Sequence, residues 1–166
     1  MLSVVLPCLS VRQPWAAAII HLGKDVENRP WDTSCRGPLL IHASKRKPQP
    51  EEMAALFDLL GPVDEDQVLN RIERVYGTLQ YGAVIGCVDL MDVVHDSTSP
   101  WAEQGSHHWL LHNPRSLPPL VMRGHQGLFN VKLAPHDAAL LGLPADQYPR
   151  EHPNFGFVMP DLEDEQ

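Results

Sequence analysis

The sequence predicts an α+β domain in which a mixed or antiparallel β-barrel is flanked by helices. Several strand-like segments are interrupted by helical ones without regular alternation, which disfavours a doubly wound α/β sheet. The longest apolar segment, Ala83–Val94, fits a central barrel strand that bends at Gly86. No glycine-rich phosphate-binding motif follows a strand, so the sequence indicates no dinucleotide or triphosphate site of that type.

The N-terminal third predicts a strand, a helix and two further extended segments. Residues 8–11 are strand-like, and residues 14–22 should form a helix because Pro14 suits a first helical position and Gly23 suits the cap. Its apolar face consists of Trp15, Ala18, Ile19 and Leu22. Residues 24–29 should be extended, and residues 38–44 should form a strand with Leu39, Ile41 and Ala43 on one face.

The middle of the chain predicts a helical insert at about residues 50–75. After a basic loop at 45–50, Glu51 and Glu52 favour the start of a helix that ends at Gly61, and residues 64–74 predict a weaker second helix. Residues 107–112 and 127–133 are strand candidates, and the proline-rich segment 113–124 is expected to be a loop between them.

Length and composition predict one domain over residues 1–160, followed by an acidic tail at 161–166. No apolar segment has the length of a membrane helix, and the N-terminus lacks the features of a secretory signal, so a cytoplasmic location is expected. The three cysteines are scattered and form no CxxC pair, which predicts buried free thiols.

The net charge of −8 disfavours binding to extended duplex DNA, because that affinity depends on many contacts from Lys and Arg to phosphates. Four acids lie in the last six residues, so the rest of the chain carries −4. Any site for nucleic acid is therefore expected to be local and to take single strands or nucleotides.

Two motifs near the N-terminus carry a family resemblance. A Gln-Pro-Trp helix start precedes a G-x-K-x-x-E-x-R motif formed by Gly23, Lys24, Glu27 and Arg29, and similar blocks follow in order at residues 36–44, 84–90, 107–117 and 124–131. The chain thus resembles the ASCH family of the PUA-like superfamily up to about residue 133. The resemblance implies a PUA-like β-barrel beside a polar cleft that binds RNA or a modified nucleotide.

The resemblance also implies possible catalytic residues. Some small ASCH proteins are amidohydrolases that act on acetylated cytidine with a Lys, a Thr and a Glu, and at least one relative resembles a ribonuclease. Lys24 matches the Lys, Glu27 stands where the family has Thr, and Glu103 is the candidate for the Glu. Lys24 is expected just beyond the helix, at an exposed strand edge. The alternative to a catalytic role there is a surface salt bridge between Lys24 and Glu27.

The residues themselves indicate a ligand-binding surface. Single-stranded bases stack on aromatic and Arg side chains, and basic loops bind phosphates. These patterns select Arg12, Gln13, Trp15, Arg29, His42, Lys45 and Trp109 as ligand-binding candidates, with Trp101 as a further stacking wall. The alternative to ligand binding by the tryptophans is that they pack in the hydrophobic core. The alternative for the basic loop at 45–50 is that its side chains are only solvated.

Three functions therefore stand side by side. The favoured one is a module that binds single-stranded RNA or a nucleotide, without membrane contact. The alternative is a hydrolase at the same cleft, either amidohydrolase-like or ribonuclease-like. A protein-interaction or regulatory domain is the second alternative. No metal site or cofactor is predicted, although a ribonuclease-like reaction could require a divalent ion.

Overall fold

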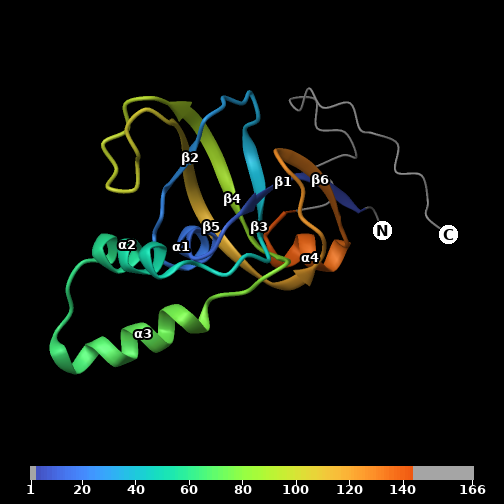
Figure 1. Cartoon of the computed structure of the whole chain (residues 1–166). Coiled ribbons are helices and arrows are strands. Elements are labelled where there is room, and N and C mark those ends of the chain that lie inside the picture. The colour runs from blue at the N-terminus through green and yellow to red at the C-terminus, as the bar shows by residue number, and fades with distance from the viewer. Residues whose placement is uncertain (1–2, 144–166) are drawn as a thin grey trace.

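The computed structural model describes residues 3–143. The apolar segments form one curved sheet and the helices that pack beside it (Figure 1). The elements are β1 (Val4–Val11), α1 (Trp15–His21), β2 (Val26–Arg29), β3 (Gly37–Ala43), α2 (Pro50–Leu60), the short 3-10 helix η1 (Glu65–Gln67), α3 (Val68–Gly77), β4 (Ala83–Val94), β5 (His107–Val121), β6 (Leu128–Leu133) and α4 (Pro135–Leu140). The acidic tail predicted at 161–166 lies outside the described residues.

Six strands form a mixed sheet in the order β2-β5-β4-β3-β1-β6. β1 and β3 are parallel, and the other neighbouring pairs are antiparallel. The predicted α+β class is confirmed. The predicted barrel is not, because β2 and β6 remain at opposite edges of the sheet: β2 has only four residues, and it pairs with the first four residues of β5.

The two faces of the sheet carry separate hydrophobic clusters, as strand alternation requires. Leu39 and Ile41 of β3 pack on the face covered by α1, together with Ile19 and the fully buried Trp109. Leu40, between them in sequence, points to the other face and packs with residues of α4. The alternation predicted for this strand is therefore confirmed.

The proline-rich segment 113–124 was predicted to be a loop, and this prediction is wrong for most of its length. β5 continues through it to Val121 and pairs with β4 across Ser116↔Gly86 and Leu120↔Val84. The pairing of β5 with β2 ends at Leu110, so within residues 3–143 no strand pairs with that edge of the later part of β5. Prolines, which cannot donate to a second neighbour, are tolerated on such an edge.

Gly86 allows β4 and β5 to approach closely. A Cβ atom at this position would lie 2.3 Å from the carbonyl oxygen of Arg115 and 2.9 Å from Ile20 Cδ1. The register of β4 against β5 shifts on both sides of this position. Gly86 therefore marks the distortion expected within the central strand, and it also leaves room for α1.

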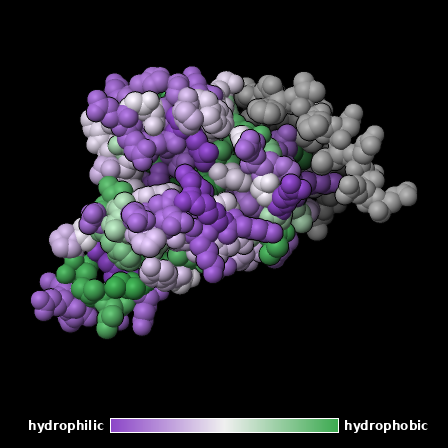
Figure 2. Space-filling model, viewed as in Figure 1, coloured by the Kyte–Doolittle hydropathy of each residue, from purple (hydrophilic) through white to green (hydrophobic). Residues whose placement is uncertain are grey.

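The helical insert lies to one side of the sheet. Met53 and Leu56 of α2 and Val75 of α3 pack against Ala18 of α1, whereas Leu69 remains 72% exposed. Figure 1 shows α3 projecting from the body, and Figure 2 shows apolar surface on this projecting unit. No helix within residues 3–143 has the length and hydropathy needed to cross a membrane.

Candidate functional site

The G-x-K turn directs Lys24 into the protein. Gly23 follows α1 with φ +81°, a conformation that favours glycine. The next amide, Lys24 N–H, donates to the Ala18 carbonyl at 3.0 Å, which returns the chain across the end of the helix. Lys24 is consequently buried, with 5% of its surface exposed, and the expectation of an exposed strand edge is wrong.

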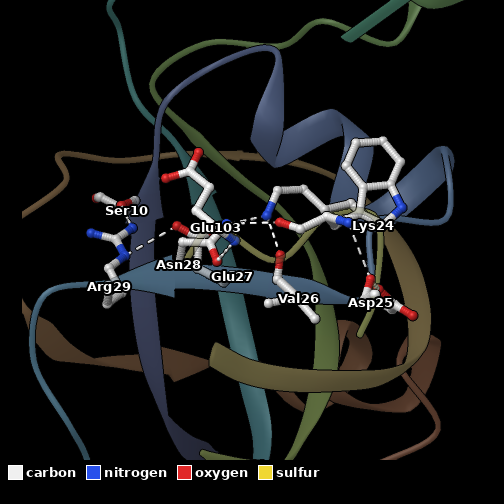
Figure 3. Close-up of polar contacts among 10 residues, drawn as sticks. Ser10, Lys24, Asp25, Val26, Glu27, Asn28, Arg29 and Glu103 are labelled. Carbon is white, nitrogen blue, oxygen red and sulfur yellow. Dashed lines mark hydrogen bonds and ion pairs between the residues drawn. The ribbon is translucent and has the colours of Figure 1, made fainter. Parts of the chain in front are cut away.

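Glu27 forms ion pairs with two cations. Lys24 Nζ lies 3.1 Å from Glu27 Oε2, and Arg29 Nε lies 3.1 Å from Glu27 Oε1 (Figure 3). Lys24 Nζ also donates to the Val26 carbonyl, and Arg29 Nη2 donates to the Ser10 carbonyl at 2.9 Å. Glu27 is itself only 8% exposed, so this is a buried charge network and not the surface salt bridge considered above.

These charges line the floor of a cavity of about 500 Å³, here called the first cavity. Its wall is formed by residues of β1, α1, β2, α2 and the loop before β5: Ser10, Val11, Arg12, Trp15, Lys24, Glu27, Asn28, Arg29, Pro30, Leu59, Pro100, Trp101, Ala102 and Glu103. The structure therefore brings together seven of the residues predicted for the site, namely Arg12, Trp15, Lys24, Glu27, Arg29, Trp101 and Glu103.

Asn28 fixes the wall of the cavity that faces β2. Its Nδ2 donates to the Trp101 carbonyl at 2.8 Å, and its Oδ1 accepts from Glu103 N–H at 2.9 Å. His108 Nε2 lies 2.7 Å from the Glu103 carbonyl and also contacts this loop. Asn28 was not predicted as a site residue, because alternation along β2 places it on the face opposite Glu27 and Arg29, and only the fold of the loop before β5 brings Trp101 and Glu103 to it.

The rim of the first cavity combines aromatic and charged groups. Trp15 and Trp101 are both partly buried, and both line the cavity. Arg12 and Glu103 are exposed, and among the described residues neither forms an ion pair. Two indole side chains, an unpaired guanidinium and an unpaired carboxylate thus line the same cavity as the buried Lys24–Glu27–Arg29 network.

Two of the predicted ligand-binding residues are buried and make contacts inside the protein instead. Gln13 is fully buried: its Nε2 donates to the Gln80 carbonyl at 2.8 Å, and its Oε1 accepts from Ala17 N–H at 2.9 Å. Trp109 is fully buried in the core, with its ring edge-on to Trp31 at 4.7 Å. Neither side chain lines the first cavity, so the stacking surface proposed for Trp109 does not exist in this structure.

His42 and Lys45 line a different hollow. This second hollow has a volume of about 600 Å³ and also includes Ser10, Ser44 and Arg123. His42 was expected in the same cleft as Lys24, and the structure corrects that expectation. β3 carries His42 on the face opposite Ile41, whose side chain packs beneath α1.

No group of three or more His, Cys, Asp or Glu side chains within residues 3–143 has an arrangement that could hold a metal ion. The three cysteines are free and buried, as predicted, and none lines the first cavity. Burial raises the pKa of the Cys35 thiol to about 12 and that of Cys87 to about 12, which keeps both protonated at neutral pH. The first cavity presents cations, carboxylates and aromatic rings.

Comparison with known proteins identifies the family. The model of the ASCH domain matches residues 9–159. The chain is 40% identical over 88 residues to human activating signal cointegrator 1 and 38% identical over 88 residues to its mouse counterpart. Each match covers 51% of this chain and 14% of the relative, so these relatives are much longer proteins. The chain belongs to the ASCH domain family.

Proposed function

We propose that this ASCH domain binds an unpaired nucleotide of RNA in the first cavity. One observation carries the proposal: two partly buried tryptophans border a cavity whose floor is a fixed, buried Lys–Glu–Arg network. Aromatic faces and Arg planes stack on unpaired bases, while oriented donors and acceptors read the base edge. The volume of about 500 Å³ lies within the usual range for small-ligand sites.

The charge network favours recognition because it is already formed without a ligand. Both oxygens of Glu27 accept from cations, and Arg29 is also held by the Ser10 carbonyl. Groups held in this way lose little conformational freedom when a ligand binds. The single exposed cation of the rim, Arg12, is positioned for a phosphate or a base plane.

A direct binding experiment tests this function. Titration calorimetry with single-stranded RNA tetramers and with a duplex of the same composition should show binding of the single strands only. Arg12→Gln should weaken that binding at least tenfold, whereas Arg74→Gln, an exposed change on α3, should leave it unchanged. Equal affinity of both variants, or preferential duplex binding, would contradict the proposal.

Hydrolysis at the same cavity is the second candidate, and Glu103 favours it. Its carboxylate is exposed and lines the same cavity as the Lys24 ammonium group (Figure 3). A free carboxylate can move a proton, and the ammonium group can stabilise a developing oxyanion. Turnover of acetylcytidine or of a labelled RNA by the wild type, abolished in Glu103→Gln, would establish catalysis; binding without turnover would leave the recognition function.

The name of the longer relatives is compatible with the third candidate, a regulatory or protein-interaction function. Activating signal cointegrator 1 is named for a role in signalling, but the shared segment is a small part of it. The open first cavity favours a small ligand over a purely structural role for this surface. The cytoplasmic location expected from the N-terminus stays a prediction.

A further inference from the structure

The second hollow has the composition of an anion site. Lys45 and Arg123 are exposed at its rim, and none of its lining residues is Asp or Glu. Among the described residues neither cation forms an ion pair. The first cavity, by contrast, balances its cations with Glu27 and Glu103. In a protein with a net charge of −8, a hollow lined by cations without acids is a distinct local feature.

The interior of the second hollow offers polar groups in fixed positions. His42 Nε2 lies 2.8 Å from the Met122 carbonyl, which can only accept, so Nε2 carries the proton. His42 Nδ1 then faces the Ser10 hydroxyl at 3.0 Å. The hydroxyl oxygen of Ser44 is buried and, within the described part of the chain, has no hydrogen-bond partner. An unsatisfied hydroxyl in a hollow that also has two exposed cations in its lining can donate to an oxyanion.

Gly124 brings the backbone against these groups. A Cβ atom at this position would lie 2.4 Å from Ser10 Oγ and 2.7 Å from His42 Cε1, so no larger residue fits without movement of the site. Lys45 is held similarly: its aliphatic stem lies against Gly82, where an added Cβ would be 3.0 Å from Lys45 Cγ. The two cations are therefore presented from a closely packed wall formed by the ends of β3 and β5.

Ser10 connects the second hollow to the first cavity. Its carbonyl accepts from Arg29 on the side of the first cavity, and its hydroxyl contacts His42 on the side of the second. Ser10 lines both hollows, and Figure 3 shows it beside Arg29 at the end of the charge network. The linings of the two hollows therefore meet at Ser10.

We propose that the second hollow binds a phosphate group, namely that of a nucleotide adjacent to the one held in the first cavity. The position of the polynucleotide rests on the proposed function, whereas the anion site itself stands on Lys45, Arg123, Ser44 and the absence of acids in its lining. Single-stranded sites combine a base-stacking surface with cations that follow the backbone. The two hollows would together bind a short strand of RNA.

Two probes separate the anion site from the polynucleotide. Inorganic phosphate should shift the backbone amide NMR signals of Ser44 and Gly124 in a saturable way in the wild type. The double variant Lys45→Gln/Arg123→Gln should lose this effect, and both changed side chains are exposed, so the fold should be retained. Arg74→Gln/Lys132→Gln changes the charge equally at exposed positions outside the hollow, and it should behave as the wild type.

The length dependence of RNA binding tests the second part. A tetramer should bind the wild type at least tenfold more tightly than a nucleoside does. In Lys45→Gln/Arg123→Gln this gain should fall below threefold while nucleoside affinity is unchanged. Phosphate shifts without any RNA or nucleoside binding would retain the anion site and refute the proposed function. Nucleoside binding with no phosphate shifts and an undiminished tetramer gain would refute the second site alone.

Discussion

Lys24 Nζ lies 3.1 Å from Glu27 Oε2 in a buried ion pair, and the same carboxylate binds Arg29 through its other oxygen. Removing the ammonium group leaves a buried carboxylate with one cation in place of two. Lys24→Ala should therefore lower the free energy of unfolding by about 3 kcal/mol, the usual scale for breaking a buried pair. Urea unfolding measures the loss, and Lys47→Ala, an exposed change in the basic loop, should alter stability little.

The exposed position predicted from the sequence implied that loss of Lys24 would change the free energy of unfolding little. The buried ion pair reverses that expectation. A destabilisation below about 1 kcal/mol would show that the pair is solvated, as surface pairs are. Activity or binding lost in Lys24→Ala consequently needs a folding control, whereas Arg12→Gln and Glu103→Gln change exposed side chains of the same cavity.

Asn28→Ala should release the cavity wall that Asn28 holds through Trp101 and Glu103. Two hydrogen bonds are lost, so the unfolding free energy should fall by about 1 to 3 kcal/mol. Hydrogen exchange of the Glu103 amide should accelerate because its acceptor is gone. Asn70→Ala, at an exposed position of α3, is the matched control and should change neither quantity. Unchanged exchange at Glu103 in Asn28→Ala would show that the loop is held by other contacts.

Gly86→Ala should be strongly destabilising because its Cβ atom meets the Arg115 carbonyl at 2.3 Å, a backbone atom that cannot turn aside. Gly77→Ala meets nothing within 4 Å and should be neutral or slightly stabilising. Thermal unfolding of the two variants compares the same chemical change in the two environments. Similar midpoints would mean that β4 and β5 do not approach as described.

Alkaline pH should weaken the fold through the buried thiols. Burial disfavours the thiolate and raises the pKa of Cys35 from 9.0 to about 12 in the folded protein. Its stabilising effect is therefore complete below the ordinary value and is lost as pH rises through the interval between the two. Within this interval each such thiol should contribute a slope of about 1.4 kcal/mol per pH unit.

Urea unfolding under reducing conditions at several pH values measures that slope. Cys35→Ala should decrease it by the contribution of one thiol, whatever the variant does to absolute stability. An identical slope in both proteins would contradict the protonated state assigned to the buried Cys35 thiol.

Salt dependence provides a further test of RNA binding. Arg12, Lys45 and Arg123 are the exposed cations of the two hollows, which allows about three phosphate contacts and a logarithmic salt slope of about −2 for single strands. Fluorescence anisotropy at several salt concentrations gives this slope. A much steeper dependence would require a basic surface outside both hollows.

Several strands, the helices α1, α2 and α3, and the charge motif could be predicted from the sequence because their signals are local, whereas α4 was not predicted. Ala83–Val94 is the strand expected, and alternation placed Leu39 and Ile41 correctly on one face. The continuation of β5 through its prolines could not be predicted, since it depends on which edge of the strand β2 leaves free. An open edge is a property of the assembled sheet.

The site shows the same division. The spacing of Lys24, Glu27 and Arg29 indicated their convergence, but burial decides their energetics, and burial depends on how the turn at Gly23 places Lys24. His42 and Lys45 line the second hollow, whose lining shares only Ser10 with that of the first cavity, and Arg123 joins them only through folding. Local sequence patterns therefore identified residues that line the two hollows, but they did not show which residues share a hollow.

The side-chain N–H signals of the tryptophans test the first cavity most directly. On titration of isotope-labelled protein with a single-stranded RNA tetramer, the indole signals of Trp15 and Trp101 should shift saturably, because both rings line the cavity. The signal of Trp109 should stay in place, because its ring is buried in the core. Arg12→Gln should weaken the saturation at least tenfold. Saturable binding without shifts at Trp15 and Trp101 would place the RNA elsewhere and contradict the assignment of the first cavity.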